Sequence, residues 1–234
     1  MTYLFQPEPQ PYLPVAYSDE RIPVRRIFCV GRNYAAHARE MGRDPDREPP
    51  FFFCKPADAI VKHGITVPYP PETVNLQYEG ELAVVLGKDG ANITQSAALD
   101  HVWGYAIAND LTRRDIQTAA KELGRPWDMG KGFDHSAPIS AVHSANKIGH
   151  LTHGRIMTTV NGAVRQFADL KDMIWSVSET ISILSQSVIL KAGDVILTGT
   201  PAGVGALNIG DTCVVSIDGL GELTTKIGMP IYTA

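Results

Sequence analysis

The sequence predicts an α+β protein that consists mainly of strands in a mixed or largely antiparallel sheet, together with three helices. Apolar runs of strand length recur along the chain, such as Leu82–Leu86. Asn161 and Gly162 stand between two short runs, and this pair favours the type I′ turn of a β-hairpin. Strands and helices do not alternate regularly, which argues against repeated βαβ units. The 234 residues are enough to enclose a substantial core.

The chain is expected to be one domain preceded by an extended arm. Residues 1–23 form the predicted arm, because prolines at positions 7, 9, 11 and 14 fix φ and disfavour a helix. Residues 24–234 show no repeat, low-complexity segment or clear linker, so they are predicted to form a single domain. The first residues lack the basic start and apolar stretch of a signal peptide.

Composition gives little support to several classes of function. The chain has 21 basic and 25 acidic residues, a net charge of -4, so neither nucleic acid nor a membrane surface is expected as a partner. No apolar run approaches the roughly 20 residues of a membrane span. The 3 cysteines form no CxxC pair, which predicts reduced, buried thiols that serve in packing. Together these features predict a cytoplasmic protein.

Local signals define the elements of the first half of the chain. They predict a strand over 24–31, a helix over 33–42, a loop over 43–50 and strand-like sequence over 50–61. Asn33 is the expected N-cap of the helix, and Gly42 follows its last turn. The loop is charged and rich in proline, and loops of this kind beside a site often act as lids.

The second half is predicted to contain most of the strands. We expect strands over 76–87 and 102–111, an amphipathic helix over 112–124, a hairpin over 157–166, a helix over 169–186, a strand over 194–201 and a final pair of strands. The helix over 169–186 is predicted from the spacing of Met173, Ile174, Val177, Ile181 and Leu184.

Three carboxylates are the candidate metal ligands. Glu79 and Glu81 stand two residues apart at the start of a strand, so their side chains point to the same face. Asp110 ends another apolar strand and can reach the place where strands converge. Like charges this close favour a bound cation, and hard divalent cations prefer oxygen ligands. The alternatives are an exposed strand face for the two glutamates and an N-cap role for Asp110.

A group of cationic and polar residues follows these carboxylates. Arg114 and Gln117 share a face of the helix that begins after Asp110, and Lys131 lies between glycines. Such side chains can hold the carboxylate of a keto acid. The alternative for this group is a solvated helix face. For Arg113, which directly precedes Arg114, a solvated position is the preferred interpretation.

Two further motifs suggest chemistry. His37 and Glu40 lie one turn apart on a predicted helix, and a carboxylate can orient a histidine and raise its basicity as a general base. An ordinary surface pair is the alternative. The loop LTGTPAGVG does not match a phosphate-loop motif. It offers the hydroxyls of Thr198 and Thr200 and free backbone N–H groups, which suit a carboxylate.

Together these segments resemble the fumarylacetoacetate hydrolase family. The landmarks that carry the resemblance are VGRNYAAHAREM, FFFCKPADAIV, YEGELAVVLG, GYAIANDLTRRDIQ, KGFDHSAPIS, TTVNGAVRQ and GDVILTGTPAGVG, in that order. The resemblance covers nearly the whole chain after the arm and is strongest to the bacterial acylpyruvate and fumarylpyruvate hydrolases. It implies a mixed β roll with peripheral helices, a single catalytic domain and a homodimer.

The resemblance also implies roles for individual residues. The metal ligands fall on Glu79, Glu81 and Asp110, with Mg²⁺ or Mn²⁺ as the ion. The catalytic pair falls on His37 and Glu40. The residues expected to contact substrate are Arg114, Gln117, Lys131 and Thr200, with Lys131 also expected to take part in catalysis.

The expected activity is hydrolysis of the carbon–carbon bond of a β-diketo acid, most readily fumarylpyruvate to fumarate and pyruvate in gentisate breakdown. His37 would activate water, and the metal would stabilise the departing enolate. A dicarboxylic substrate needs a second cation, and Arg32, Arg43 and Arg47 are the candidates. The alternatives are an oxaloacetate-type decarboxylase, a 2-hydroxyhepta-2,4-diene-1,7-dioate isomerase and a non-catalytic metal-binding protein.

Overall fold

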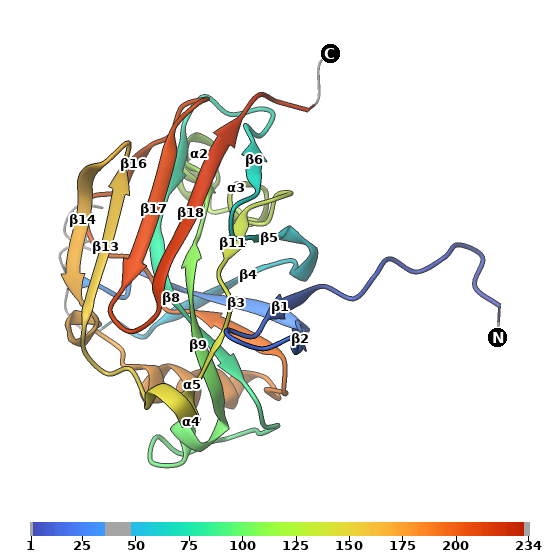
Figure 1. Cartoon of the computed structure of the whole chain (residues 1–234), viewed down its shortest axis with the longest axis vertical. Helices are drawn as coiled ribbons and strands as arrows, with labels where there is room; N and C mark the ends of the chain where they lie inside the picture. The colour runs from blue at the N-terminus through green and yellow to red at the C-terminus, as the bar shows by residue number, and fades with distance from the viewer. Residues whose placement is uncertain (1, 36–47, 232–234) are drawn as a thin grey trace.

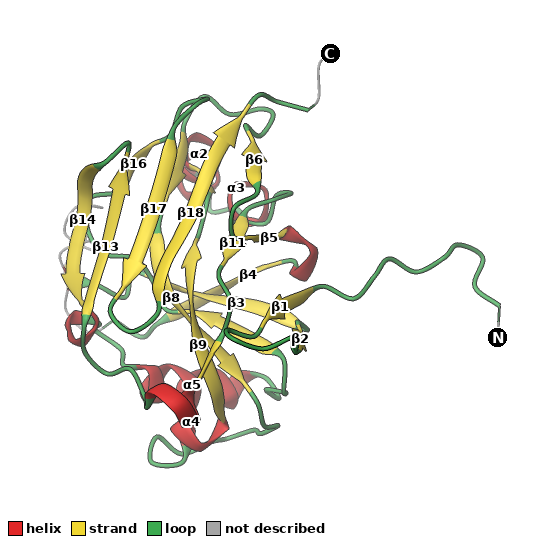
Figure 2. Ribbon diagram, viewed as in Figure 1, coloured by secondary structure: helices red, strands yellow, loops and turns green. Residues whose placement is uncertain are grey.

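The computed structural model describes residues 2–35 and 48–231, and it shows a curled, mostly β fold with helices at its periphery (Figures 1 and 2). The strands of the largest sheet are, in spatial order, β4 (Phe51–Lys55), β3 (Arg26–Gly31), β15 (Asp194–Leu197), β8 (Gly80–Leu86), β9 (Val102–Asn109), β11 (Ala137–Ile139) and β5 (Ile60–Lys62), with β12 (His143–Ser144) also paired to β9. β3 is parallel to β15 and β11 is parallel to β5, whereas the other neighbours are antiparallel. The predicted mixed sheet is therefore confirmed.

A second sheet stands beside the first and contains the predicted hairpin. Its strands are, in spatial order, β14 (Ala163–Asp169), β13 (Arg155–Val160), β17 (Thr212–Ile217), β18 (Gly221–Gly228) and β6 (Thr66–Pro68). Asn161 and Gly162 join β13 to β14 with φ values of 51° and 81°. Positive φ at both positions is what a type I′ turn requires, so the predicted hairpin is confirmed.

Two smaller sheets complete the strands. β10 (Thr112–Arg113), β7 (Leu76–Tyr78) and β16 (Gly205–Ala206) form one, and β1 (Tyr12–Pro14) pairs with β2 (Arg21–Pro23) in the other. Residues before β1 run away from the body of the protein (Figure 1). Within the predicted arm, however, Leu13 is fully buried in the core. The boundary at residue 23 remains a prediction.

The helices are short and lie at the edges of the sheets (Figure 2). The described α-helices are α2 (Arg114–Glu122), α3 (Asp128–Lys131), α4 (Ala145–Ile148) and α5 (Val177–Ser187), and the 3₁₀ turns are η1 (Ala57–Ala59), η2 (Ala98–His101) and η3 (Leu170–Asp172). Gly124, with φ of 63°, follows α2 in the left-handed conformation that often ends a helix. The predicted end of this helix is confirmed.

α5 begins later than the apolar spacing predicted. Ser176 is its N-cap, and the Ser176 and Glu179 side chains each bond the other residue's backbone N–H in a capping box. Met173 and Ile174 lie before the helix. Met173 bridges to Tyr34, and the Ile174 N–H donates to the Asn33 carbonyl at 2.7 Å. This segment therefore supports the chain after β3 and does not extend the helix.

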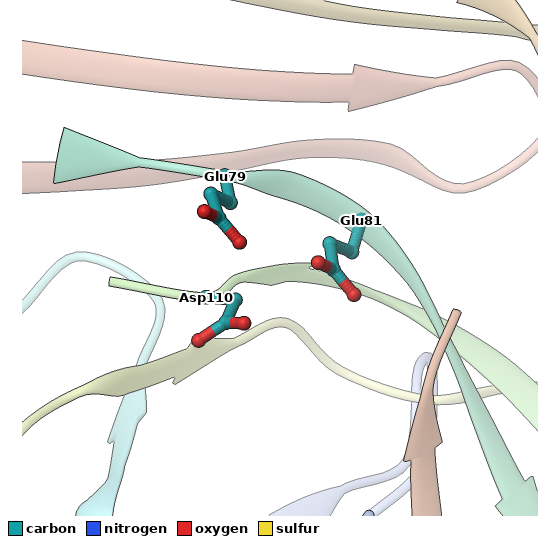
Figure 3. A group of neighbouring side chains, drawn as sticks. All are labelled: Glu79, Glu81 and Asp110. Carbon is teal, nitrogen blue, oxygen red and sulfur yellow. The ribbon is translucent and has the colours of Figure 1, made fainter. Parts of the chain in front are cut away.

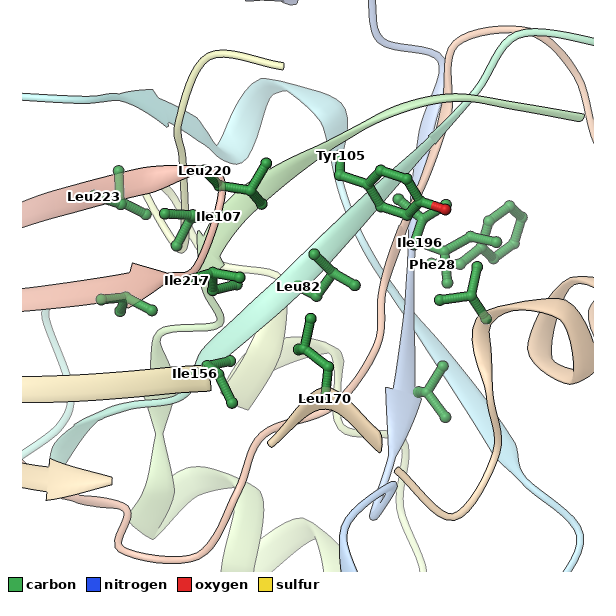
Figure 4. Close-up of a cluster of buried hydrophobic side chains, with 14 of the residues drawn as sticks. Phe28, Leu82, Tyr105, Ile107, Ile156, Leu170, Ile196, Ile217, Leu220 and Leu223 are labelled. Atoms are coloured by element: carbon green, nitrogen blue, oxygen red, sulfur yellow. The ribbon is translucent and has the colours of Figure 1, made fainter. Parts of the chain in front are cut away.

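Two apolar clusters lie on opposite faces of β8. Leu82, Val84 and Leu86 belong to the larger cluster (Figure 4), whereas Ala83 and Val85 belong to the smaller one. Side chains alternate across a strand, so a continuous apolar run is expected when both faces are covered. β8 is thus a rigid, doubly buried strand, and Glu81 lies within it.

Two predictions about the surface have different outcomes. Cys29 and Cys213 are buried as predicted, but Cys54, on the edge strand β4, is exposed. Within the ranges described, no helix is long and apolar enough to cross a bilayer.

Candidate active site

Three carboxylates converge where β8 and β9 lie side by side. Glu79 precedes β8, Glu81 lies within it, and Asp110 follows β9. One oxygen from each of them lies within 4.8 Å of the others, and the side chains point toward one another (Figure 3). All three are buried, with 5%, 2% and 1% exposure, so the alternative of an exposed strand face is wrong.

Asp110 faces the interior of the site and does not cap the next helix. Arg113 occupies the N-cap position of α2, without a capping side-chain bond. The Asp110 Oδ2 atom accepts from Lys131 Nζ at 2.7 Å, and its Oδ1 atom lies 2.8 Å from Lys55 Nζ. The N-cap alternative is therefore wrong, because two buried ammonium groups engage this carboxylate instead.

Backbone hydrogen bonds fix the spacing of the carboxylates. The Asp110 N–H donates to the Glu79 carbonyl at 2.8 Å, and the Glu79 N–H donates to Asn109 Oδ1 at 3.0 Å. Gly80 lies between the two glutamates, and a Cβ there would come within 2.3 Å of Thr158 Oγ1. The close approach of the second sheet therefore requires glycine at this position.

Gln166 is a site residue that the sequence analysis did not single out. Its Oε1 accepts from the Gly80 N–H at 3.1 Å, and its Nε2 donates to Thr200 Oγ1 at 2.7 Å and to the Pro201 carbonyl at 2.8 Å. The Thr200 hydroxyl in turn donates to the Gly80 carbonyl at 2.9 Å. Both backbone groups of Gly80 are thus held. Gln166 is 1% exposed. The signal available in the sequence was a glutamine at a position of the predicted hairpin that faces inward.

Lys55 is a second residue that the sequence analysis did not single out. It is 2% exposed, and its ammonium donates to the carbonyls of Leu111 (3.0 Å) and Lys131 besides its contact with Asp110. Lysine is almost never fully buried unless it is paired, and Lys55 directly follows the apolar residues of β4, where a buried side chain is expected. That position was the available signal.

Cations neutralise two of the carboxylates more directly than the third. Lys131 Nζ lies 2.7 Å from both Glu79 and Asp110, and Arg114 also pairs with Glu79. Burial lowers the pKa of Lys131, but Asp110 and Glu79 outweigh this effect, and the net pKa is raised. Glu81 instead accepts from the Gly199 N–H at 2.7 Å.

The environment of Glu81 fits a bound divalent cation. Burial, followed by the charges of Asp110 and Glu79, raises the pKa of Glu81 well above its usual range. A cation among the three oxygens would remove this penalty, and an all-carboxylate set suits Mg²⁺ or Mn²⁺. The donor atoms present therefore fit the ion that the sequence predicted.

The predicted substrate residues line one cavity with the carboxylates. Its lining consists of Val30, Gly31, Arg32, Phe53, Glu79, Glu81, Arg114, Gln117, Thr118, Lys121, Trp127, Lys131 and Thr200. Arg114, Gln117, Lys131 and Thr200 are thus brought together, although their roles toward substrate stay predictions. Asp110 is not part of this lining, but it accepts a hydrogen bond from Lys131, which is.

Several of these residues already bond one another. Lys131 directs its three N–H donors at Glu79, Asp110 and Thr112, each at 2.7 Å. Arg114 donates to Gln77 at 2.7 Å and to Gln117 at 2.5 Å, besides Glu79. In this arrangement Lys131 orders the carboxylates, and direct contact with substrate would require it to release one of them.

Arg113 does not lie on a solvated helix face, so that prediction is wrong. It is 4% exposed, donates to the carbonyls of Met129 and Pro71, and lies over the Phe133 ring with 4.8 Å between Cζ and the ring centroid. It sits at the turn into α2, where α3 packs against the start of the helix. The guanidinium satisfies carbonyls of this turn, which explains its burial.

The glycine turn binds a carboxylate of the protein itself. The Gly199 N–H donates to Glu81, as given above, and Thr198 Oγ1 donates to the Leu82 carbonyl at 3.0 Å. Gly199 has φ of 91°, and a Cβ there would come within 2.7 Å of the Asn33 Cβ. The predicted affinity of this turn for an anion is therefore used to position a site carboxylate.

Four residues of the predicted site lie outside the described part of the chain. They are His37, Glu40, Arg43 and Arg47. The helix predicted over 33–42 lies largely there as well. Asn33 itself is described, and its side-chain oxygen accepts from the Trp175 N–H at 2.7 Å.

Comparison with known families shows which family the chain belongs to. The family model for the C-terminal domain of fumarylacetoacetate (FAA) hydrolase matches residues 26–228. The chain belongs to the fumarylacetoacetate hydrolase family. The family identified from the landmark segments is thus confirmed, as is the mostly β, curled fold that the resemblance implied.

Relatives within the family have several activities. The crystal structure of fumarylpyruvate hydrolase from Pseudomonas aeruginosa, in complex with Mn²⁺ and pyruvate, is 51% identical, covers 97% of this chain and 100% of its own, and has a TM-score of 0.95. Mitochondrial oxaloacetate tautomerase of Homo sapiens is 41% identical over 89% of this chain and 94% of its own length. The 2-hydroxyhepta-2,4-diene-1,7-dioate isomerase of Mycobacterium marinum is 33% identical, with a TM-score of 0.79 over 90% of this chain and 77% of its own.

Proposed function

We propose that this protein is a divalent-metal-dependent hydrolase that cleaves the carbon–carbon bond of an acylpyruvate, with fumarylpyruvate as the substrate and fumarate and pyruvate as the products. The main support is the fumarylpyruvate hydrolase at 51% identity, which was crystallised with Mn²⁺ and pyruvate. In this chain the buried trio Glu79, Glu81 and Asp110 supplies a donor set that fits such an ion.

The protein's own residues would hold the ion and the pyruvoyl end of the substrate. Glu79, Glu81 and Asp110 would bind the ion, as Mg²⁺ or Mn²⁺. When bound, the ion would supply Lewis-acid stabilisation of the oxygen on which negative charge develops during cleavage. Arg114 and Gln117 line the cavity beside Glu79 and would orient the carboxylate of the substrate.

Three further residues have proposed roles in the reaction. Thr200 lines the cavity, donates to Gly80 and accepts from Gln166, so its hydroxyl could accept one further hydrogen bond, from substrate or water. Lys131 would keep Glu79 and Asp110 charged and fixed. His37, oriented by Glu40, is proposed as the base that removes a proton from the attacking water.

Oxaloacetate tautomerisation is the second candidate function, because the human mitochondrial relative with this activity is 41% identical. Both activities act on a 2-keto acid, so the carboxylate trio alone does not distinguish them. The chain shares more sequence identity with the fumarylpyruvate hydrolase, 51% over 97% of its length, than with the tautomerase, and this favours hydrolysis.

An ultraviolet assay separates the two candidates. The purified protein is given fumarylpyruvate, acetylpyruvate and oxaloacetate in turn, each with Mg²⁺, with Mn²⁺ and with a chelator, and products are identified chromatographically. We expect fumarylpyruvate to give pyruvate and fumarate, and the chelator to stop the reaction. Rapid interconversion of the keto and enol forms of oxaloacetate, with both acylpyruvates left intact, would refute the proposal in favour of the tautomerase.

A further inference from the structure

One face of α2 lines the cavity along its length. Arg114, Gln117, Thr118 and Lys121 all contribute to the lining, with the spacing i, i+3, i+4 and i+7 that puts residues on one helix face. Arg114 and Gln117 lie at the inner end, next to Glu79. Lys121 is half-buried and lies about 10 Å farther along the helix than Arg114, at 1.5 Å per residue.

Arg32 also lines this cavity, and its backbone conformation is unusual. Its φ is 58°, in the left-handed region that residues with a Cβ rarely adopt. The Arg32 guanidinium lies over the Phe51 ring, with 5.2 Å between Cζ and the ring centroid. Backbone strain of this kind tends to occur at ligand sites, where the surrounding structure enforces it. Here it directs a cation to the cavity immediately after β3 ends at Gly31.

We propose that Arg32 and Lys121 form a second anion-binding position, which receives the distal carboxylate of a dicarboxylic acylpyruvate. This inference rests on the proposed function, since it takes the pyruvoyl end to lie at the carboxylate trio. It selects Arg32 among the arginines considered from sequence and adds Lys121, which the sequence analysis did not consider.

The division of charge within the cavity supports this assignment. Arg114 and Lys131 both pair with Glu79, so these inner cations offset the charge of the carboxylates. Among the described residues of the lining, Arg32 and Lys121 are further cations, and Lys121 lies toward the far end of α2. Cationic side chains at this place can bind a second negative charge on the ligand.

The length of the ligand also fits. The two carboxyl carbons of an extended seven-carbon diacid are roughly 7.5 Å apart, from bonds of about 1.5 Å. This span lies between the rise from Gln117 to Lys121, about 6 Å, and that from Arg114 to Lys121, about 10 Å. A four-carbon diacid such as oxaloacetate spans only about 4 Å from the same bond lengths, which is less than either rise.

Substrate selectivity provides the first test. Lys121→Gln, Arg32→Gln and the conservative Lys121→Arg are compared with wild type and with the control Lys147→Gln, which changes an exposed lysine on α4. We expect each glutamine variant at the two cavity positions to lower the ratio of kcat/KM for fumarylpyruvate over acetylpyruvate by about tenfold to a hundredfold, the range for a hydrogen bond to a charged group. Lys121→Arg should restore most of the ratio, and the control should equal wild type. An unchanged ratio in both glutamine variants would overturn the proposal.

A binding measurement keeps this proposal separate from the proposed activity. The probes are 2-oxoheptanedioate, which lacks the second keto group needed for cleavage, and its monoacid counterpart 2-oxoheptanoate, each titrated calorimetrically with Mg²⁺ present. We expect wild type to bind the diacid about tenfold more tightly or better, and Lys121→Gln to abolish that preference. If neither acylpyruvate is cleaved but this preference and its loss are seen, the hydrolase proposal fails and the anion position stands. Equal affinity of wild type for the two probes would overturn the anion position, whatever the activity.

Discussion

Gln166 makes a strong prediction, because one buried side chain holds the peptide between two candidate metal ligands. In Gln166→Leu the side chain keeps nearly the same volume but loses its bonds to the Gly80 N–H, the Thr200 hydroxyl and the Pro201 carbonyl. Each such bond contributes about 1 kcal/mol net, so the free energy of unfolding should fall by about 3 kcal/mol. Mutation of a residue that orients metal ligands typically lowers metal affinity 10- to 100-fold, and we expect Gln166→Leu to weaken metal binding to a similar extent.

Two measurements and a matched control test this reasoning. Urea unfolding gives the stability of the metal-free protein, and calorimetric titration with Mn²⁺ gives the affinity. The control is Thr158→Val, which changes another buried polar side chain beside Gly80. The Thr158 hydroxyl has no hydrogen-bond partner among the described residues, so removing it should be close to neutral. If Gln166→Leu lowers stability but binds Mn²⁺ like wild type, Gln166 does not position the ligands and the reasoning is refuted.

Two further predictions concern the same site, and a third concerns Asp211, which accepts from Asn161 of the β13–β14 turn. Gly199→Ala should destabilise the protein by at least about 1–2 kcal/mol in urea unfolding, since φ is 91° and the new Cβ would meet Asn33; unchanged stability would contradict the geometry. Glu81→Gln should weaken Mn²⁺ binding at least tenfold and remove the rise in Tm that the ion gives wild type, and retention of that rise would exclude Glu81 as a ligand. The Asn208 N–H and other donors lower the pKa of Asp211, so its stabilising effect is present above the usual carboxyl pKa and lost as pH falls through the lowered one. The stability difference between wild type and Asp211→Asn should therefore shrink on acidification below about pH 4, and a difference that grows instead would reverse the sign of the linkage.

Local pattern was sufficient for several of the strands and for the common direction of two site carboxylates, but it missed β1 and β2 in the predicted arm and β10 at the start of a predicted helix. The apolar run of β8 and the Asn161–Gly162 turn depend on neighbouring residues, and both formed as predicted. The i, i+2 spacing of Glu79 and Glu81 fixes a common direction for their side chains. The sequence alone therefore predicted that these carboxylates act together, and the family resemblance agreed.

Only the tertiary structure determined the residues that hold the site in place. Gln166 comes from the second sheet, Lys55 from β4 and the Gly199 N–H from the turn after β15, and each reaches the trio from a distant part of the sequence. Their partners are backbone groups or buried charges, which local spacing does not specify. Arg113 was misjudged for the same reason, since its burial depends on how α3 packs against the start of α2. The sequence by itself determined which groups carry the proposed chemistry; long-range packing decided what surrounds them, because burial and hydrogen-bond partners arise only when separate strands meet.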